Sequence, residues 1–330
     1  MTEALRYLTE KDVVAALTIP RAIDALQRML VAQARDGARN VPKALATWGD
    51  GSSMHALGSV QPGGYAGFKT WVHTKAGGGS LFSLFDADTG LLRAVIEARA
   101  LGMLRTAAIS GVATRALAPE TATQAALIGT GPQAVTQLAA LAAVRTLRRV
   151  RIYSPTPAKR RAFVEAVAGK YDFAVEEAPT LEQALAGAEI VTLITRAVEP
   201  FVDAALLADC RHLNAVGAIL PAKAEFAQDV FERADRVVVD DLENARRGSR
   251  ELRERYGADG APWDGVAVLG ELLARGETRA PDARLTLFKG MGMGLSDLAM
   301  AQVAYEHASD HGLGVALPPQ TRENLLLAQP

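Results

Sequence analysis

The stretch AALIGTGPQAVTQLAALAAVRTLRRVRIYSPTPAKRR, residues 125–161, decides the fold. A short apolar run meets Gly129, Gly131 and Ala134 in the pattern G-x-G-x-x-A, and an Ala/Leu-rich segment with helical spacing follows. Strand, tight turn and helix in this order are the context of a dinucleotide-binding fingerprint, in which the glycines let the backbone approach a pyrophosphate. The free N–H groups at the helix N-terminus would hold the phosphates. The expected cofactor contacts in this loop are Gly129, Thr130, Gly131, Pro132, Gln133 and Ala134.

A second strand is predicted at residues 149–153, and the residues that follow it bear on the choice of cofactor. They lie ~20 residues beyond the glycines, where the adenosine ribose is bound. An NAD site places a carboxylate there, whereas this chain offers Ser154, Thr156, Lys159 and Arg160. Hydroxyls and cations suit a 2′-phosphate, so the sequence predicts NADP(H) in preference to NAD(H). The alternative is that the cations form a solvated helix face.

Composition limits the classes of partner. The chain has 330 residues, 49% of them hydrophobic and 22% charged, with a formal net charge of −1. We find no basic, aromatic-interleaved patch for nucleic acid and no apolar run of the ~20 residues that a membrane span needs. The N-terminus lacks a signal-peptide core, and Cys210 is the only cysteine, so we expect a cytoplasmic protein. His307 and His311 have no third ligand beside them, so no metal site is expected.

The regions on either side of the fingerprint predict two domains. Residues 11–36 have the periodicity of an amphipathic helix, and residues 42–95 contain short strands joined by glycine-rich turns, which indicates an antiparallel or mixed sheet. From residue 119 onward, apolar strands alternate with helical stretches, which predicts a doubly wound parallel sheet. The fold class is therefore α/β. We expect a dinucleotide-binding domain at 119–304, inserted into a mixed-sheet α+β domain made of 1–118 and about 305–330.

Ligands bind at the carboxyl ends of the strands in such sheets. That rule selects Thr195, Val216 and Gly217 as cofactor contacts. A second glycine-rich strand-to-helix turn near residue 290 adds Lys289 and Gly292. Residues 242–283 are predicted to be mostly helical and are otherwise uninformative.

Two cations stand out in apolar surroundings. Lys69 lies in GFKTWV, and Arg105 lies in a predicted helix whose other face is almost wholly apolar. A cation in such a helix often faces water. The functional alternative is that Arg105 points into a cleft and binds a carboxylate through its planar guanidinium.

These motifs, read together, resemble the ornithine cyclodeaminase/μ-crystallin family over nearly the whole chain. The segments that carry the resemblance are GFKTWV with Lys69, LRTAA with Arg105 and Thr106, GTGPQA, HLNAVGA and TLFKGMGMGLSDL. The resemblance implies a Rossmann domain inserted into a substrate and dimerisation domain, a homodimer, and nicotinamide-dependent chemistry at the C–N bond of α-amino or α-imino acids. It also implies that Lys69 and Arg105 hold the substrate carboxylate beside the reacting carbon.

The chain departs from the family pattern at two positions. Cyclodeaminases carry an aspartate two residues after the glycine of the NAVGA strand, and Ile219 stands there in this sequence. An isoleucine cannot pair with an ammonium group, so ornithine cyclisation is not expected. Lys43 takes the place of an arginine in relatives, which removes one bidentate contact. The expected substrate-binding residues are Lys43, His73, Thr106 and Ile219, beside the catalytic Lys69 and Arg105.

The sequence thus predicts an NADPH-dependent reductase of the C=N bond of α-imino acids, cyclic ones in particular. Such a reaction needs mainly orientation and electrostatic stabilisation, because the substrate nitrogen can arrive protonated. Arg105 would hold the carboxylate, and Lys69 would hold it too or deliver a proton. The alternatives are an amino-acid dehydrogenase or reductive aminase, an ornithine cyclodeaminase, and a non-catalytic crystallin-like binding protein.

Overall fold

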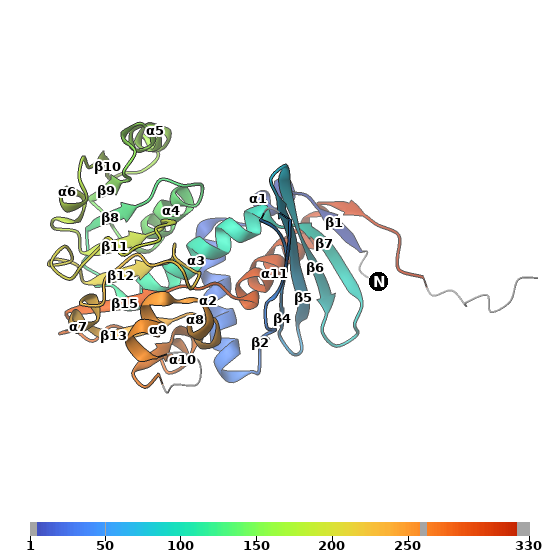
Figure 1. Cartoon of the computed structure of the whole chain (residues 1–330). Coiled ribbons are helices and arrows are strands. Elements are labelled where there is room, and N and C mark those ends of the chain that lie inside the picture. Colours follow the sequence, from blue (N-terminus) through green and yellow to red (C-terminus); the bar gives the residue numbers. More distant parts are fainter. Residues whose placement is uncertain (1–4, 50, 258–262, 322–330) are drawn as a thin grey trace, which may run out of the picture.

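The structure is a computed structural model that describes residues 5–49, 51–257 and 263–321. Two eight-stranded sheets lie in it side by side, with long helices between them (Figure 1). The α/β fold class predicted from the sequence is confirmed, because one sheet is mixed and the other is parallel throughout.

The first sheet combines the chain's beginning and end. Its spatial order is β16, β1, β7, β6, β5, β4, β2, with β3 also paired to β4. β1 runs parallel to β7 and antiparallel to β16. The strands are β1 (Arg6–Leu8), β2 (Arg39–Asn40), β3 (Ala44–Trp48), β4 (Ser52–Val60), β5 (Tyr65–Thr74), β6 (Gly77–Asp86), β7 (Leu92–Glu97) and β16 (Val315–Ala316).

Four helices cover one face of this sheet: α1 (Glu10–Ala16), α2 (Ile19–Arg35), α3 (Arg99–Leu117) and α11 (Gly294–His311). The amphipathic run at 11–36 forms two helices rather than one. The second begins after Thr18, whose side chain accepts from the backbone of Arg21 and so caps the helix. α11 packs against α2, α3, β4 and β5 from its first turn, and the boundary expected near residue 305 falls inside this helix. Of the C-terminal segment expected in this domain, residues 322–330 lie outside the described part of the chain.

The opposite face of the first sheet is apolar and open. Strand pairing puts Met54 beside Val72 and Leu81 beside Thr70 on this face, because side chains alternate along each strand. We call Trp48, Met54, Phe68, Val72 and Leu81, all exposed, the outer patch.

The second sheet has the order β10, β9, β8, β11, β12, β15, β13, β14. Its strands are β8 (Gln124–Ile128), β9 (Arg149–Tyr153), β10 (Ala174–Glu177), β11 (Ile190–Leu193), β12 (His212–Ala215), β13 (Ala234–Val239), β14 (Val266–Val268) and β15 (Leu285–Lys289). The helices of this half are α4 (Ala134–Val144), α5 (Pro157–Val167), α6 (Leu181–Leu185), α7 (Val230–Arg233), α8 (Leu242–Gly248), α9 (Arg250–Tyr256) and α10 (Leu269–Ala274). Strand β14 lies in the region predicted to be mostly helical.

Strand order reverses at β8, which has β9 on one side and β11 on the other. Ligands of doubly wound sheets bind at such a switch point, beyond the carboxyl ends of the strands. Among the described residues, none of the helices combines the length and the apolar character needed to cross a bilayer.

Candidate active site

A cavity of about 1480 Å³ opens at the switch point. Its lining includes the loops that follow β8, β9, β11 and β12, together with the first two turns of α3. The charged residues of the lining are Arg99, Arg105, Lys159, Arg196 and Lys223, with no Asp or Glu among the described residues that form it. This cavity therefore favours an anionic ligand and is large enough for a dinucleotide.

The glycine loop after β8 forms one end of the cavity, and Gly129, Thr130, Gly131, Pro132 and Gln133 all line it. Gly129 has a φ of +120°, and a Cβ there would lie 2.5 Å from the carbonyl oxygen of Ile194, so only glycine fits. Ala134 begins α4 and is fully buried. No side chain caps the N-terminus of α4, and although the Ala134 N–H donates to the carbonyl oxygen of Gly131 (2.9 Å), the positive end of the helix is left to a phosphate. These residues fit a dinucleotide.

The loop after β9 forms the adenosine end. Ser154, Thr156 and Lys159 line the cavity here. Arg160 does not line it. Its guanidinium is buried and donates to the carbonyl oxygen of Ser154 (2.6 Å) and to Glu177 (3.1 Å), so it shapes the loop from behind.

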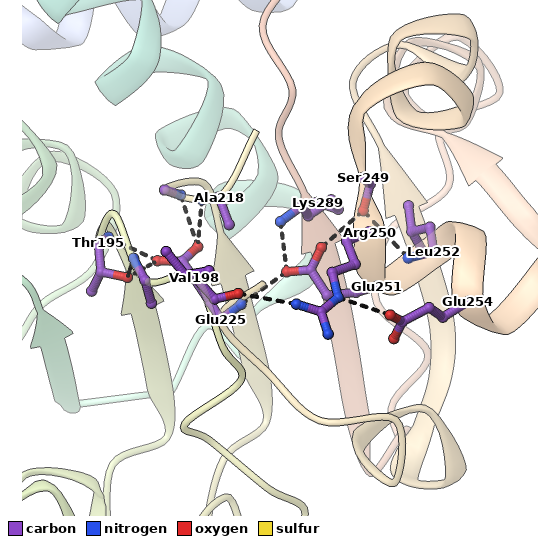
Figure 2. Close-up of polar contacts among 12 residues, drawn as sticks. Thr195, Val198, Ala218, Glu225, Ser249, Arg250, Glu251, Leu252, Glu254 and Lys289 are labelled. Atoms are coloured by element: carbon purple, nitrogen blue, oxygen red, sulfur yellow. Dashed lines mark hydrogen bonds and ion pairs between the residues drawn. The ribbon is translucent and has the colours of Figure 1, made fainter. Parts of the chain in front are cut away.

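The loops after β11 and β12 form the other end, where Thr195, Val216, Gly217 and Ile219 line the cavity. Lys289 is placed elsewhere, because it is fully buried and its ammonium pairs with Glu251 at 3.0 Å (Figure 2).

Gly292 completes the cavity from the loop after β15. Asp240 fixes this loop by accepting from the backbone N–H groups of Met291 (2.9 Å) and Gly292 (2.7 Å). Burial raises the pKa of Asp240 to about 6.

A second cavity, of about 930 Å³, lies between the β5–β6 hairpin and the start of α3. Lys69, Trp71 and His73 line it. Arg99, Met103, Arg105 and Gln133 line both cavities, so the two spaces meet at this point. A small molecule in the second cavity would thus face a dinucleotide in the first.

A buried charge cluster lies where the cavities meet. The Lys69 ammonium donates to Asp297 Oδ1 at 2.9 Å, and Arg105 Nε lies 3.8 Å from the same oxygen. Arg105 Nε and Asp297 Oδ2 are buried without a hydrogen-bond partner. Arg105 lines both cavities, so a polar ligand there can pair with its guanidinium, whereas Asp297 is not among the described lining residues of either cavity.

Burial lowers the pKa of the Lys69 ammonium; the Asp297 charge opposes this shift, and the Arg105 charge adds to it. Burial also lowers the pKa of Lys43, with further lowering by Arg105 and Lys69. Both lysines lie over the ring of Trp71, with Nζ at 5.5 Å for Lys43 and 5.3 Å for Lys69.

The remaining predicted substrate residues are divided between the cavities. Thr106 and Ile219 line the first, where the Thr106 hydroxyl donates to the carbonyl oxygen of Gly102. His73 is exposed and lines the second. Asp297 was missed in the sequence, although a single carboxylate inside the apolar helix GLSDLAMA was the signal that could have found it.

A parallel sheet with a glycine-walled, cationic cavity at its switch point, joined to a smaller polar cavity, defines a dinucleotide-dependent oxidoreductase. The sequence profile of the ornithine cyclodeaminase/mu-crystallin family matches residues 24–312, and the chain belongs to this family. The resemblance noted in the sequence is thereby confirmed.

A relative in sequence and two similar solved structures support the nicotinamide cofactor. The chain is 33% identical to the Delta(1)-pyrroline-2-carboxylate reductase of Bacillus cereus over 234 residues, which cover 70% of this chain and 71% of the relative. The iminosuccinate reductase of Paracoccus denitrificans in complex with NAD+ is similar with a TM-score of 0.88 and 26% identity, over 96% of this chain and 99% of that chain. A dimeric archaeal alanine dehydrogenase with bound NAD has a TM-score of 0.87 and 27% identity, over 95% and 99% of the two chains.

Proposed function

We propose that this enzyme reduces the C=N bond of α-imino acids, cyclic ones in particular, to α-amino acids with NADPH. The observation that carries the proposal is the charge cluster at the meeting point of the two cavities, where Lys69 and Arg105 bring two cations to the lining. The two relatives named as reductases of pyrroline-2-carboxylate and iminosuccinate support the same reaction class.

The cluster matches the polar groups of an α-imino acid. The Arg105 guanidinium binds the carboxylate, helped by the neighbouring Lys69 charge. Asp297 is in neither cavity lining as described, and its carboxylate holds the Lys69 ammonium in place beside the site. The cofactor supplies a hydride when it is bound.

Lys69 has two roles in this proposal. Its ammonium pairs with Asp297 at 2.9 Å in a buried place, so its position beside Arg105 is fixed. Since burial lowers its pKa, Lys69 can also release a proton to a substrate nitrogen that arrives neutral.

NADPH is proposed over NADH because the adenosine end of the cavity contains Ser154, Thr156 and Lys159 and no carboxylate within the described lining. A 2′-phosphate would meet donors there, whereas the ribose hydroxyls of NADH would lack the acceptor that NAD sites provide. Comparing the steady-state constants for the two cofactors tests this choice, and a preference for NADH would refute it.

We further propose a homodimer formed through the outer patch. Met54, Val72 and Leu81 belong to the outer patch and also line the second cavity, so a second copy seated on the patch would narrow the mouth of that cavity. The similar archaeal alanine dehydrogenase is a dimer. We place the enzyme in the cytoplasm, since its single cysteine is free and buried.

The test is an NADPH-oxidation screen over cyclic imino acids with five- and six-membered rings, and over keto acids with and without ammonia or alkylamines. We expect turnover of a cyclic imino acid without added amine. A strict requirement for an amine with a keto acid would identify an amino-acid dehydrogenase or reductive aminase instead. Proline formation from ornithine would reveal a cyclodeaminase, and cofactor binding without turnover would indicate a crystallin-like binding protein.

A further inference from the structure

Glu225 is a fully buried carboxylate directly behind the cofactor cavity, and it was not singled out in the sequence. Its Oε1 accepts from the backbone N–H and the hydroxyl of Thr195, both at 2.7 Å. Its Oε2 accepts from the backbone N–H groups of Gly217 (2.9 Å) and Ala218 (3.0 Å). Figure 2 shows the carboxylate between these two loops.

The contacts join two strands beyond the point where their ladder ends. The last pairing between β11 and β12 is Leu193 with Ala215, and the loops that follow line the cavity. At Gly217 a Cβ would lie 2.2 Å from the Thr195 nitrogen and 2.4 Å from Glu225 Oε1. No side chain fits between the loops, so the glycine and the carboxylate together set their separation.

Glu225 is itself held from the rear by a buried ion pair. Its backbone N–H donates to Glu251 Oε1 (3.1 Å), and the same oxygen accepts from Lys289 (3.0 Å). Ser249 donates to the other oxygen of Glu251 (3.0 Å). Lys289 thus acts on the cavity wall through Glu251 and Glu225 rather than by lining the cavity (Figure 2).

The same contacts decide which groups the wall can offer to a ligand. Glu225 takes up the N–H groups of Thr195, Gly217 and Ala218. The carbonyl oxygens of Thr195, Val216 and Gly217 accept no hydrogen bond within the described parts of the chain. The backbone N–H groups of Thr195, Gly217 and Ala218 are therefore not available to a ligand, and the donors near this wall are the side chains of Arg196 and Lys223. A dinucleotide with its adenosine over β9 extends past the glycine loop after β8 toward β11 and β12. Its nicotinamide half therefore meets this wall.

We propose that Glu225 is a positioning residue that fixes the wall of the nicotinamide half of the cofactor site by clamping the loops after β11 and β12. The inference rests on the nicotinamide cofactor of the proposed function, but not on the identity of the substrate. Without the clamp, the freed amide groups would have to turn toward water or toward the cofactor, and the wall would lose its shape.

The test is calorimetric titration of the full chain with NADPH and, separately, with adenosine 2′,5′-bisphosphate, which lacks the nicotinamide half. In Glu225→Gln a carboxamide NH₂ faces N–H donors, so at least one loop is released. We expect the Kd for NADPH to rise about tenfold or more, while the Kd for the adenosine fragment stays within about twofold of the wild-type value. The matched control is Glu199→Gln, an exposed carboxylate at the outer end of the same network, which should leave both constants unchanged.

Two results would overturn the proposal: an unchanged Kd for NADPH in Glu225→Gln, or an equal weakening of both ligands, which would indicate general damage to the domain. If Glu225→Gln does not fold, Thr195→Val removes one of the four donors, and an unchanged Kd for NADPH in that variant overturns the proposal as well. If the proposed function is wrong, the wild-type enzyme will not reduce imines. The comparison of Kd values can still be made in that case, because it measures binding and not turnover.

Discussion

The charged residues to which we assign the proposed reaction have partners that are far away in the sequence. Lys69 and Arg105 could be recognised from the sequence because cations in apolar segments are unusual. Asp297 could not be paired with them, since it lies 228 residues after Lys69 and only the tertiary fold brings the two together. Arg160 and Lys289 were predicted from the sequence to contact the cofactor, but the structure places both outside the cavity lining. Both lie next to cavity-lining residues in the chain, yet each is buried in an ion pair behind the wall.

Replacing Arg105 with Ala should lower kcat/KM for the imino acid by about two orders of magnitude, or on the order of 3 kcal/mol, because a buried charged hydrogen bond to the carboxylate is lost. Steady-state kinetics measure the effect. Arg115→Ala is the matched control, since Arg115 lies on the same helix and pairs with Asp24 at the surface. Unchanged kinetics in Arg105→Ala would remove this residue from the substrate site.

Replacing Asp297 with Asn should move the alkaline limb of the kcat/KM profile to lower pH. Asp297 opposes the lowering of the Lys69 pKa by burial, so its removal lowers that pKa further and the ammonium form is lost at a lower pH. The measurement is a pH–rate profile, with Asp24→Asn, an exposed carboxylate on α2, as the control. An alkaline limb that stays in place would show that the charge of Lys69 does not govern the rate.

At the scale of elements, the presence of a mixed sheet and of a doubly wound parallel sheet followed from periodicity and turn residues, whereas the order of the strands came from the structure. Strand β14 did not, because its three residues are too few to show a pattern among the charged helices around it. The division of residues 11–36 into α1 and α2 depends on the cap at Thr18 rather than on periodicity. The loop after β15 matters to the site because it brings Gly292 against Arg105.

Replacing Gly292 with Ala should raise the KM for the imino acid. Gly292 has a φ of +83°, and a Cβ would lie 2.3 Å from Arg105 Nη1, so the guanidinium must move. The control is Gly276→Ala, at a φ of +70° with nothing within 4 Å of the added Cβ. Both variants should lose about 1 kcal/mol of stability through backbone strain, but only Gly292→Ala should alter KM. An equal effect on KM in both variants would show that the contact between Gly292 and Arg105 does not govern KM.

At the scale of the whole molecule, the segment that forms the second sheet, β8 to β15, lies in the chain between the segments that form the first sheet. The sequence predicted the insertion through the family resemblance, whereas the packing of α11 on the first sheet from Gly294 onward appears only in three dimensions.

Replacing Phe68 with Glu should prevent dimerisation, because it puts a charge into the outer patch, which the proposed interface would bury. Analytical ultracentrifugation should show a species of half the wild-type mass. Val14→Glu, at an exposed apolar position on α1, is the control and should leave the mass unchanged. A monomeric wild-type protein, or a dimeric Phe68→Glu variant, would contradict an interface at this patch.

Replacing Asp240 with Asn should make the free energy of unfolding rise more steeply with pH between about 4 and about 6. Burial raises the pKa of Asp240 to about 6, so the contribution of this group to the free energy of unfolding falls as pH rises through that window. Burial lowers the pKa of His212 to about 3, so the contribution of that group to the free energy of unfolding rises over the same window. Urea titrations at several pH values would show the steeper slope, and an unchanged slope would mean that Asp240 ionises normally.

The interleaved chain path also has a consequence for biosynthesis. Strand β1 emerges first from the ribosome, but its antiparallel neighbour β16 and the helix that supplies Asp297 emerge last. The dinucleotide-binding half can therefore complete its own sheet on the nascent chain. Lys69 lacks its counter-ion Asp297 until α11 has been synthesised. We expect a truncated polypeptide that stops before α11 to retain a structured cofactor half beside an unfinished first sheet.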